Sequence, residues 1–438
     1  MIDEQSLIGF ITGQRWFGSK TREVIHARVV DRSQLRDDEP RLELQLIEVG
    51  FETGMHETYQ LLSDDGHDAL ADPRNLRELV HMIRGARKVP AEEGVVEFGA
   101  VEGFAALGQE LREVRVVGTE QTNSSIVFDE ELILKVFRRL EAGINPDLEV
   151  LRFLTERGFE NIAQLAGWYA YAGKPMDATL GILQRFVAGS VDGWELMLDL
   201  VASEPAATAA RLHRLGEVTG RMHSVLGSDP NDPSFSPEET PAEALGLLTA
   251  RVDEEIEEVF IELPDGVEEL EPIRGRGEEV RERLRLLSSI GDLGRVIRHH
   301  GDFHLGQALW AENDWVIIDF EGEPARPLPE RRRKRSPLRD VAGMLRSFAY
   351  VASALPRLRD TTAPEDWEYS ARKEFLDGYR ATVDPMLVPS GTAFDKLLAV
   401  FELEKAVYEL RYELNNRPDW VSIPVAGIVR MLDEEPPA

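Results

Sequence analysis

Two aspartates near residue 300 occupy positions at which a carboxylate can do chemistry. Asp302 lies in HGDFHLGQALW, residues 300–310, and Asp319 ends the apolar run WVIID, residues 315–319. We interpret the apolar residues around them as two strands flanking a turn, since a hairpin would bring their ends together. One carboxylate can then orient and deprotonate a hydroxyl while the other holds Mg²⁺, as phosphoryl transfer requires. Gln307 is a second candidate Mg²⁺ ligand, because its side-chain oxygen suits that hard cation.

The strand expected before Asp302 is RVIRHHGD, residues 295–302. An aspartate at the end of a strand commonly caps a turn, and for either aspartate alone that reading stays open. The pair, with an amide between them, favours the catalytic interpretation. His304 lies beside Asp302, and we expect it to contact the substrate.

A kinase also needs a nucleotide-binding region, and residues 116–140 offer one. A strand leads into Gly118 and a turn of small hydroxyl and amide residues, and two further strands follow. Groups over such a turn can cover phosphates, and Gln121 and Ser124 are the side chains that we expect there. The turn alone does not identify a nucleotide site, because it lacks a GxGxxG or GKT motif.

Lys135 lies in the apolar strand LILKVF, where a lysine needs a partner or a ligand. We expect it to contact the α- and β-phosphates and to pair with Glu149. That glutamate lies 14 residues further on, in a helix that Asn145 can cap. A strand-edge lysine with a solvated ammonium group is the alternative.

The segment LGILQRFVAG, residues 180–189, is a candidate hinge into the next part of the chain. Its main chain from Gln184 through Phe186 to Val187 can offer hydrogen bonds to adenine. A simple linker between lobes fits the same residues equally well.

Composition limits the classes of function that the chain can have. Its 80 acidic and 50 basic residues give a formal charge of -30, which repels phosphate backbones, so we expect no nucleic-acid partner. No run approaches the ~18–20 apolar residues of a membrane span, and the N-terminus lacks the basic region of a signal peptide. There are no cysteines, hence no thiolate metal site. We expect a cytoplasmic protein. The basic block ERRRKRSPLRD, residues 330–340, reads as a solvated turn paired with acidic surroundings.

The order of patterns along the chain predicts three parts. Residues 1–105 show short strands and turns, including residues 24–32 and 41–51, before a helix that starts near Asp72. Residues 106–190 are again rich in strands. Residues 191–438 are mostly helical, with the segment around Asp302 and Asp319 as a strand-like island.

Several of these segments closely resemble the actinobacterial maltokinase-like proteins of the aminoglycoside phosphotransferase superfamily. The resemblance rests on HGDFHLGQALW, on VIIDFEGEPARPLPERRRKRSPLRDVAGMLRSFAY and on GTEQTNSSIVF with the following LILKVFRRLEAGINPDLEVLRFL. It covers nearly the whole chain, including QRWFGSK at residues 14–20. It implies an α+β, eukaryotic-protein-kinase-like bilobal fold, with an N-terminal cap over 1–105, an ATP-binding lobe over 106–190 and a helical C-lobe over 191–438.

The same resemblance implies roles for the residues already named. Asp302 stands where the family has its catalytic base, and Gln307 and Asp319 where it has Mg²⁺ ligands. Lys135 and Glu149 stand where it has the pair that positions the phosphates. The implied cofactors are ATP and Mg²⁺, and the implied partner is a small-molecule sugar.

Two acceptor sugars remain open. Maltokinases make maltose 1-phosphate, and a related actinobacterial group looks like glucosamine kinases, which make glucosamine 6-phosphate. The start GQRWFGSKTREV departs from the RQRWxAG type of typical maltokinases, so we favour glucosamine and keep maltose as the alternative. An aminoglycoside-modifying enzyme is a third reading.

The helical segment at residues 400–420 suggests one side of the acceptor site. Val400, Leu403, Val407, Leu410 and Leu414 form a packed stripe, and Glu404, Tyr408 and Tyr412 form a ridge beside it. We expect Glu404 and Tyr408 of this ridge to bind the sugar, with Trp420 supplying a ring. Boundary tyrosines and a core tryptophan are the alternative.

A sugar ammonium group would gain from nearby carboxylates, and we expect Glu321, Glu323 and Glu404 to supply them. Lys405 and Glu409 fall on the other side of the helix and read as a solvated pair. A different class of function is a pseudokinase or assembly partner that binds without transferring phosphate, although the full set of site residues is present. We expect a monomer.

Overall fold

The computed structural model describes residues 4–64, 67–104, 111–119 and 123–433. The chain divides into two compact units. Unit 1 comprises residues 1–189 with 326–328, and unit 2 comprises residues 190–325 and 329–438. The predicted boundary near residue 105, between a cap and a nucleotide-binding part, stays a prediction.

Unit 1 begins with an antiparallel sheet in the order β1-β2-β3-β10, with β4 paired to β3. The strands predicted at residues 24–32 and 41–51 are confirmed, and the first continues to Arg36. Helix α1 packs on the sheet through an apolar cluster that includes Leu7, Ile11, Trp16 and Phe17. The elements are α1 (Glu4–Thr12), β1 (Val24–Arg36), β2 (Leu42–Phe51), β3 (His56–Asp64), β4 (His67–Asp68) and β10 (Arg139–Leu140).

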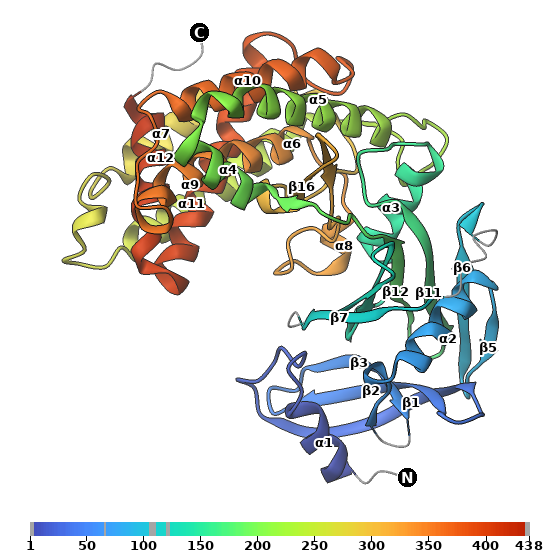
Figure 1. Cartoon of the computed structure of the whole chain (residues 1–438). Helices are drawn as coiled ribbons and strands as arrows, with labels where there is room; N and C mark the ends of the chain where they lie inside the picture. The colour runs from blue at the N-terminus through green and yellow to red at the C-terminus, as the bar shows by residue number, and fades with distance from the viewer. Residues whose placement is uncertain (1–3, 65–66, 105–110, 120–122, 434–438) are drawn as a thin grey trace. The chain divides into compact units, whose positions relative to one another are not determined.

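A second antiparallel sheet in unit 1 has the order β5-β6-β11-β12-β9-β8-β7 (Figure 1). It contains the three strands predicted over residues 116–140, while residues 120–122 of the predicted turn lie outside the described residues. Helix α2 begins where predicted, because Asp72 caps it by accepting from the Arg74 N–H. The elements are α2 (Pro73–Arg84), β5 (Lys88–Pro90), β6 (Gly94–Ala100), β7 (Val114–Thr119), β8 (Asn123–Phe128), β9 (Leu132–Phe137), α3 (Pro146–Glu156), β11 (Leu165–Gly173) and β12 (Asp177–Arg185).

The two sheets of unit 1 share one stretch of chain. Strand β9, which carries Lys135, ends at Phe137, and β10 starts two residues later as the edge strand of the first sheet. The buried amide of Gln60 on β3 donates to the carbonyls of Phe137 and Leu180, and accepts from the Tyr169 hydroxyl at 3.2 Å. The N-terminal sheet is therefore bonded to the strands around Lys135.

Unit 2 is mostly helical, as predicted. Its longest helices are α11, α9 and α6, and α10 lies alongside α5 (Figure 1). The helices are α4 (Gly193–Ser203), α5 (Thr208–Leu226), α6 (Ala242–Ile261), α7 (Gly277–Leu287), α9 (Leu338–Leu358), α10 (Trp367–Thr382), α11 (Thr392–Asn416) and α12 (Ser422–Asp433), and the short α8 (Leu328–Arg331) lies where the chain returns to this unit. The two-residue strands are β13 (Val191–Asp192), β14 (Glu238–Glu239) and β15 (Arg295–Val296).

The strand-like island in unit 2 is a hairpin of β16 (Ala308–Ala311) and β17 (Asp314–Ile317). Glu312 and Asn313 form its two-residue turn with positive φ angles of 51° and 64°, the backbone that tight hairpin loops require. The prediction of a long strand before Asp302 is wrong. That segment contains only β15, which pairs with β14, and the hairpin lies between Asp302 and Asp319 instead.

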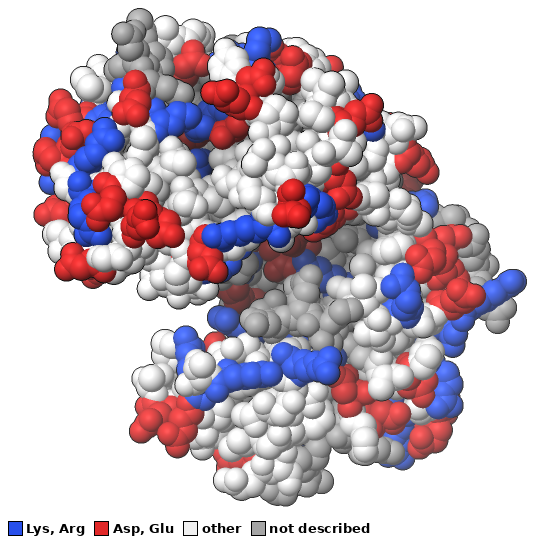
Figure 2. Space-filling model, turned by 60° about the vertical axis from the view of Figure 1, so that its left-hand side comes forward, with Lys and Arg blue, Asp and Glu red and all other residues white. Residues whose placement is uncertain are grey.

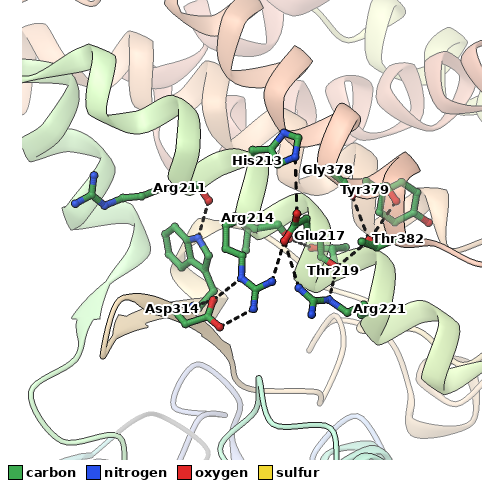
Figure 3. Close-up of polar contacts among 12 residues, drawn as sticks. Arg211, His213, Arg214, Glu217, Thr219, Arg221, Asp314, Gly378, Tyr379 and Thr382 are labelled. Carbon is green, nitrogen blue, oxygen red and sulfur yellow. Dashed lines mark hydrogen bonds and ion pairs between the residues drawn. The ribbon is translucent and has the colours of Figure 1, made fainter.

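The turn end of this hairpin is held by α5 (Figure 3). Arg214 donates two hydrogen bonds to the carboxylate of Asp314, at 2.8 and 2.7 Å, and a third to Glu217 at 2.8 Å. The indole N–H of Trp315 donates to the Arg211 carbonyl at 2.7 Å. A hairpin this short is marginal alone, so these contacts with α5 fix its position.

Acidic and basic side chains are mixed, not segregated, on the face of the molecule that Figure 2 shows. In the predicted basic block, Lys334 is nearly buried and donates to the Pro233 carbonyl and to Glu238. The interpretation of this block as a solvated turn is therefore wrong at Lys334, while its pairing with acidic neighbours is confirmed there. Among the described helices, none is long and apolar enough to cross a membrane.

Candidate active site

The loop that carries Asp302 is held by its backbone. The amides of His300 and Gly301 donate to the two carboxylate oxygens of Asp340, at 2.7 and 2.9 Å. Asp340 lies in the first turn of α9 and is 2% exposed. Burial raises the pKa of its carboxyl, but His299 and the hydrogen bond from His223 outweigh that effect and keep this pKa far below its usual range. Asp340 is therefore a fixed anionic acceptor for the loop.

The loop also packs tightly against the segment after β17. The His300 ring lies between the rings of Phe303 and Phe320, and its Nε2 is 2.9 Å from the Ile318 carbonyl. The backbones of Gly301 and Gly322 touch there, since a Cβ on Gly301 would lie 3.2 Å from the Gly322 Cα. Both glycines have positive φ, so the approach needs residues without side chains.

The two predicted metal ligands meet at the open end of the hairpin. The Nε2 of Gln307 donates to the Oδ2 of Asp319 at 3.2 Å. Gln307 directly precedes β16 and Asp319 follows β17 by two residues. Asp319 has a positive φ of 65°, in the left-handed region that aspartate adopts more readily than most residues with a Cβ. The hairpin therefore brings an amide and a carboxylate together on one loop cluster with Asp302.

Asp302 faces a lysine of α11 that the sequence analysis misplaced. The Nζ of Lys405 lies 3.8 Å from a carboxylate oxygen of Asp302 and 3.8 Å from one of Glu323. The Asp302 side chain is 27% exposed. Burial opposes the charge of Lys405, but the two carboxylates outweigh it and raise the pKa of the lysine. The expected solvated pair of Lys405 and Glu409 is therefore wrong.

The partner of Glu409 explains the error. Glu409 is buried and accepts two hydrogen bonds, at 2.9 and 2.7 Å, from the Arg346 guanidinium of α9. Helix α11 is covered on more than one side, so its charged residues meet partners inside unit 2. The predicted apolar stripe is confirmed, with Val400, Leu403, Val407 and Leu410 buried and Leu414 partly buried.

The predicted ridge on α11 has a different set of partners from those expected. Glu404 is buried and pairs with Arg251 and, at 2.9 Å, with Arg339. A carboxylate held by two guanidinium groups is a poor ligand for a sugar ammonium group, so its role in sugar binding is not supported by its contacts. Tyr408 lies under the Lys405 ammonium, 5.3 Å from its ring centre, and stacks on Tyr412.

Trp420 is neither fully exposed nor a core residue. Its ring stacks on Tyr350 at 6.2 Å between centres, and the guanidinium groups of Arg357 and Arg417 lie over it. It follows α11 in a short 3₁₀ turn, Pro418–Trp420. Tyr408 lies against Lys405, the lysine that faces Asp302, whereas Trp420 packs among Tyr350 and the two arginines. His304 is partly buried, and burial lowers the pKa of its imidazole.

In unit 1, Lys135 is largely buried on β9. Its Nζ lies 3.3 Å from a carboxylate oxygen of Asp147, and its side chain is 12% exposed. Asn145 caps α3 by accepting from the Asp147 N–H at 2.8 Å, as predicted. Glu149 is buried two residues further along the same helix. The first turn of α3 therefore faces Lys135, and Asp147 is a partner that the sequence analysis did not name.

The structure gives a different outcome for each of the other residues that were predicted to contact the nucleotide. Gln121 lies outside the described residues. Ser124 is buried, and its hydroxyl accepts from the Arg138 guanidinium at 2.9 Å. At the hinge, Gln184 lies in β12, Val187 is partly buried, and the Phe186 N–H donates to the Glu131 carbonyl at 2.8 Å. The Phe186 amide is therefore already used within unit 1.

The sequence also matches known families over defined ranges. Residues 105–375 match the phosphotransferase enzyme family, and residues 10–72 match the maltokinase N-terminal cap domain. The first match spans more than half of the chain. The chain belongs to the phosphotransferase enzyme family. The resemblance drawn from the Asp302 and Asp319 motifs is thereby confirmed.

Relatives and solved structures agree with this family. The chain is 27% identical over 333 residues to the glucosamine kinase of Streptacidiphilus jiangxiensis, covering 73% of this chain and 74% of the relative. It is 26% identical over 353 residues to the glucosamine kinase of Mycolicibacterium smegmatis, covering 78% and 85%. A solved glucosamine kinase in complex with glucosamine, ADP and inorganic phosphate superposes with a TM-score of 0.73 at 22% identity, covering 93% and 94%. The predicted kinase-like α+β fold is confirmed.

Three functional candidates were missed, and they left different signals. Asp340 was taken only as the end of the basic block, and an acidic residue in the first turn of a helix is too common to mark a function by itself. Asp147 stands in the first turn of the helix that was expected to face Lys135. Lys405 gave no local signal, because its partners Asp302 and Glu323 are about 80 to 100 residues away in the sequence.

Proposed function

We propose that this phosphotransferase moves the γ-phosphoryl group of ATP to the 6-hydroxyl of glucosamine. The observation that carries the proposal is the placement of Asp302 on a loop fixed by Asp340, beside the Gln307–Asp319 pair. The two glucosamine kinases that cover most of this chain support the choice of acceptor. We expect the enzyme to use ATP and to need Mg²⁺.

Asp302 would orient the acceptor hydroxyl and accept its proton as the bond to phosphorus forms. Phosphoryl transfer needs little covalent help from the protein, so position is the main contribution that a residue can make. The carboxylate is part-exposed and its loop is anchored by two backbone hydrogen bonds. The Lys405 ammonium, 3.8 Å from the Asp302 carboxylate, would restrict its orientation.

The residues at the hairpin end fit Mg²⁺. Gln307 and Asp319 offer an amide oxygen and a carboxylate, the donors that this hard cation prefers, and they lie within hydrogen-bond distance of each other. A bound Mg²⁺ would supply positive charge against the phosphate oxygens. Asp319 and Gln307 are the ligands that we propose, in agreement with their predicted roles.

Lys135 is the residue that we propose for the α- and β-phosphates. It lies in the sheet of unit 1 with Asp147 at 3.3 Å, so a carboxylate of α3 already orients its ammonium group. We keep Glu149 as a second acidic residue on that helix. Of the predicted hinge groups, the main chain of Gln184 and Val187 remains our candidate for adenine, and the Phe186 amide is not.

The acceptor would lie against Asp302, Glu323, Lys405 and Tyr408. A tyrosine ring can stack on the C–H face of a sugar, and the alternating charges of Lys405 and Glu323 can bind neighbouring hydroxyl and amine groups. His304 and Glu321 flank Asp302 and Glu323 along the chain, and we retain them as candidates. Glu404 and Trp420 lose their place in this proposal because of their own arginine and tyrosine contacts.

Maltose is the second candidate acceptor. The match of residues 10–72 to the maltokinase cap domain favours it, although a cap says little about an acceptor site. Lys405 also favours it, because a lysine between Asp302 and Glu323 already occupies a position that a sugar ammonium group would seek. The two sugars therefore make different demands on one lysine.

The test is ADP release with Mg²⁺-ATP across glucosamine, N-acetylglucosamine, glucose, maltose and kanamycin. The proposal expects turnover on glucosamine and little on its N-acetyl form. Turnover on maltose alone would replace glucosamine by the second candidate. Absence of turnover on every sugar, with ATP shown to bind, would favour the pseudokinase reading.

A further inference from the structure

Three buried polar side chains from three helices of unit 2 are linked by hydrogen bonds. They adjoin the loop that carries Asp302, which is called the catalytic loop below. The Nε2 of His223, on α5, is 3.1 Å from an oxygen of Asp340, on α9. The Nδ1 of the same ring is 3.0 Å from the hydroxyl of Tyr379, on α10. His223 and Tyr379 are 0% exposed. None of these three side chains is needed to explain substrate binding. Burying their polar groups costs free energy unless their hydrogen bonds are made.

We propose that Tyr379, His223 and Asp340 form a relay of hydrogen bonds that sets the position of the catalytic loop, so that Tyr379 is a positioning residue for Asp302. The inference rests on the proposed function only in treating Asp302 as the catalytic base. Tyr379 is fully buried, so it acts through His223 and Asp340 rather than on the substrate.

The Asp340 carboxylate restricts how the donors and acceptors of the relay can be arranged. The Asp340 carboxylate can only accept, and it faces the His300 N–H, the Gly301 N–H and the His223 Nε2. Nε2 must therefore carry a proton. Burial and the charge of Asp340 raise the pKa of Tyr379 well above its usual value, so its hydroxyl keeps its proton and can donate to Nδ1. Because a tyrosine hydroxyl can also accept, the geometry fixes the proton on Nε2, and the hydrogen bond with Tyr379 holds the Nδ1 side of the ring.

The helices hold Tyr379 rigidly in this place. Helices α5 and α10 approach closely at Gly216 and Gly378, where an added Cβ would lie 2.0 Å from the carbonyl oxygens of Phe375 and His213. Thr382, three residues after Tyr379, donates to the Glu217 carbonyl of α5 at 2.9 Å (Figure 3). The hydroxyl of Tyr379 is therefore fixed relative to His223, and removing it frees one side of the imidazole.

The relay ends on the two amides that immediately precede Asp302. If Asp340 shifts or rotates, His300 and Gly301 follow it, and the Asp302 carboxylate moves relative to the acceptor hydroxyl. Small displacements of a catalytic group cost rate much more than they cost ground-state binding. Loss of the relay should therefore lower kcat and leave the KM of both substrates nearly unchanged.

The test compares Tyr379→Phe with Phe375→Leu. Tyr379→Phe removes one hydroxyl and keeps the ring, and we expect kcat to fall about three- to tenfold with unchanged KM for ATP and sugar. Phe375 is also fully buried on α10 and packs on Phe348, but the structure gives it no polar contact with His223. Phe375→Leu should lower the Tm and leave kcat unchanged at temperatures well below it.

A spectroscopic readout tests the relay without any activity. In protein labelled with ¹⁵N, the His223 Nδ1 and Gly301 amide resonances should move in Tyr379→Phe and stay in place in Phe375→Leu. An unchanged kcat together with unmoved resonances in Tyr379→Phe would overturn the proposal, as would an equal loss of kcat in both variants. If the wild-type protein shows no kinase activity, the proposed function fails, and the two resonances still decide whether the relay exists.

Discussion

The catalytic loop and the α11 ridge lie next to each other in unit 2, and they use charge in opposite ways. In the loop, Asp302 is part-exposed while hydrogen bonds from the backbone, collected by the buried Asp340, hold it in position. On the ridge, Glu404 is buried and held by two arginines. A carboxylate whose position is fixed through its backbone stays available for a ligand. One fixed through its side chain does not, and the difference gives a criterion for choosing residues to mutate.

The largest effect should come from Asp302→Asn. The amide keeps the shape of the side chain but cannot accept a proton, so kcat should fall by ~10²–10⁴, the usual range for general acid–base catalysis. The loop should persist, because its amides bond to Asp340 rather than to Asp302. The measurement is steady-state ADP release together with circular dichroism. Near-normal turnover in a folded variant would exclude Asp302 as the base and remove the contrast with the ridge.

A smaller effect is expected from Gln307→Ala, which removes one proposed oxygen donor and leaves Asp319. The concentration of Mg²⁺ that gives half-maximal activity should rise about tenfold, within the range seen when a metal site loses a supporting group. The experiment is a Mg²⁺ titration at saturating ATP and sugar. Leu309→Ala in the same hairpin is a suitable control, because the residue is half-buried on β16 and offers no donor. An equal shift in both variants would mean that the hairpin, rather than the amide, matters.

The sequence alone predicted part of the loop side of this comparison, namely the hairpin before Asp319, but not the structure before Asp302. Asp302, Gln307 and Asp319 stand within 18 residues, and a hairpin between them joins groups that are already close in the chain. The strand of Lys135 and the cap of α3 at Asn145 are local features as well, and both are confirmed. The spacing of apolar residues in a strand or helix, and the capping of a helix, depend on residues that are close in the sequence. A single sequence is therefore sufficient to predict them.

The partners of the charged residues on α11 could not be predicted in the same way. Helical spacing shows which residues share a face of α11, but it does not show what covers that face. Glu409 meets Arg346 of α9, and Lys405 meets Asp302 and Glu323, all of them distant in the sequence. A long helix enclosed by other helices therefore has polar partners on several sides, and the charged residues of such a helix are the least predictable part of the site.

The next prediction uses two neighbouring residues of α11. Lys405→Met should lower kcat/KM about tenfold, because Asp302 loses the cation that restricts the orientation of its carboxylate. Glu404→Gln should change kcat/KM less than about twofold and lower the Tm more, since it leaves Arg251 and Arg339 with a weakened partner. Steady-state kinetics and thermal unfolding of both variants are the measurements. The reverse order of effects on kcat/KM would restore Glu404 as the acceptor ligand and refute the criterion drawn from the comparison.

The charge state of Lys405 gives that prediction a pH dependence of known sign. Its pKa in the folded protein is raised, so its stabilising contribution is fully present below the ordinary lysine value of about 10.4 and is lost only as the pH rises through the folded value. A wild-type rate limited by Lys405 should therefore stay constant between about pH 7 and 9. A loss of kcat/KM within that interval, absent from Lys405→Met, would show that the lysine is neutralised early and contradict the raised pKa.

The smallest effect concerns the far end of the hairpin, where Arg214 holds Asp314 with two hydrogen bonds. Both side chains are about one-third exposed, so solvent weakens the pair, and we expect a coupling energy of ~0.5–1 kcal/mol from the single variants Arg214→Gln and Asp314→Asn and their combination. Urea unfolding measures that energy, and a Mg²⁺ titration of each variant shows whether it reaches the site. Because Trp315 still bonds to the Arg211 carbonyl, the half-maximal Mg²⁺ concentration should change less than in Gln307→Ala. A larger change would mean that a shift at Asp314 moves Gln307 and Asp319 through the hairpin. Side-chain pairing would then help to position the catalytic loop as well as the α11 ridge.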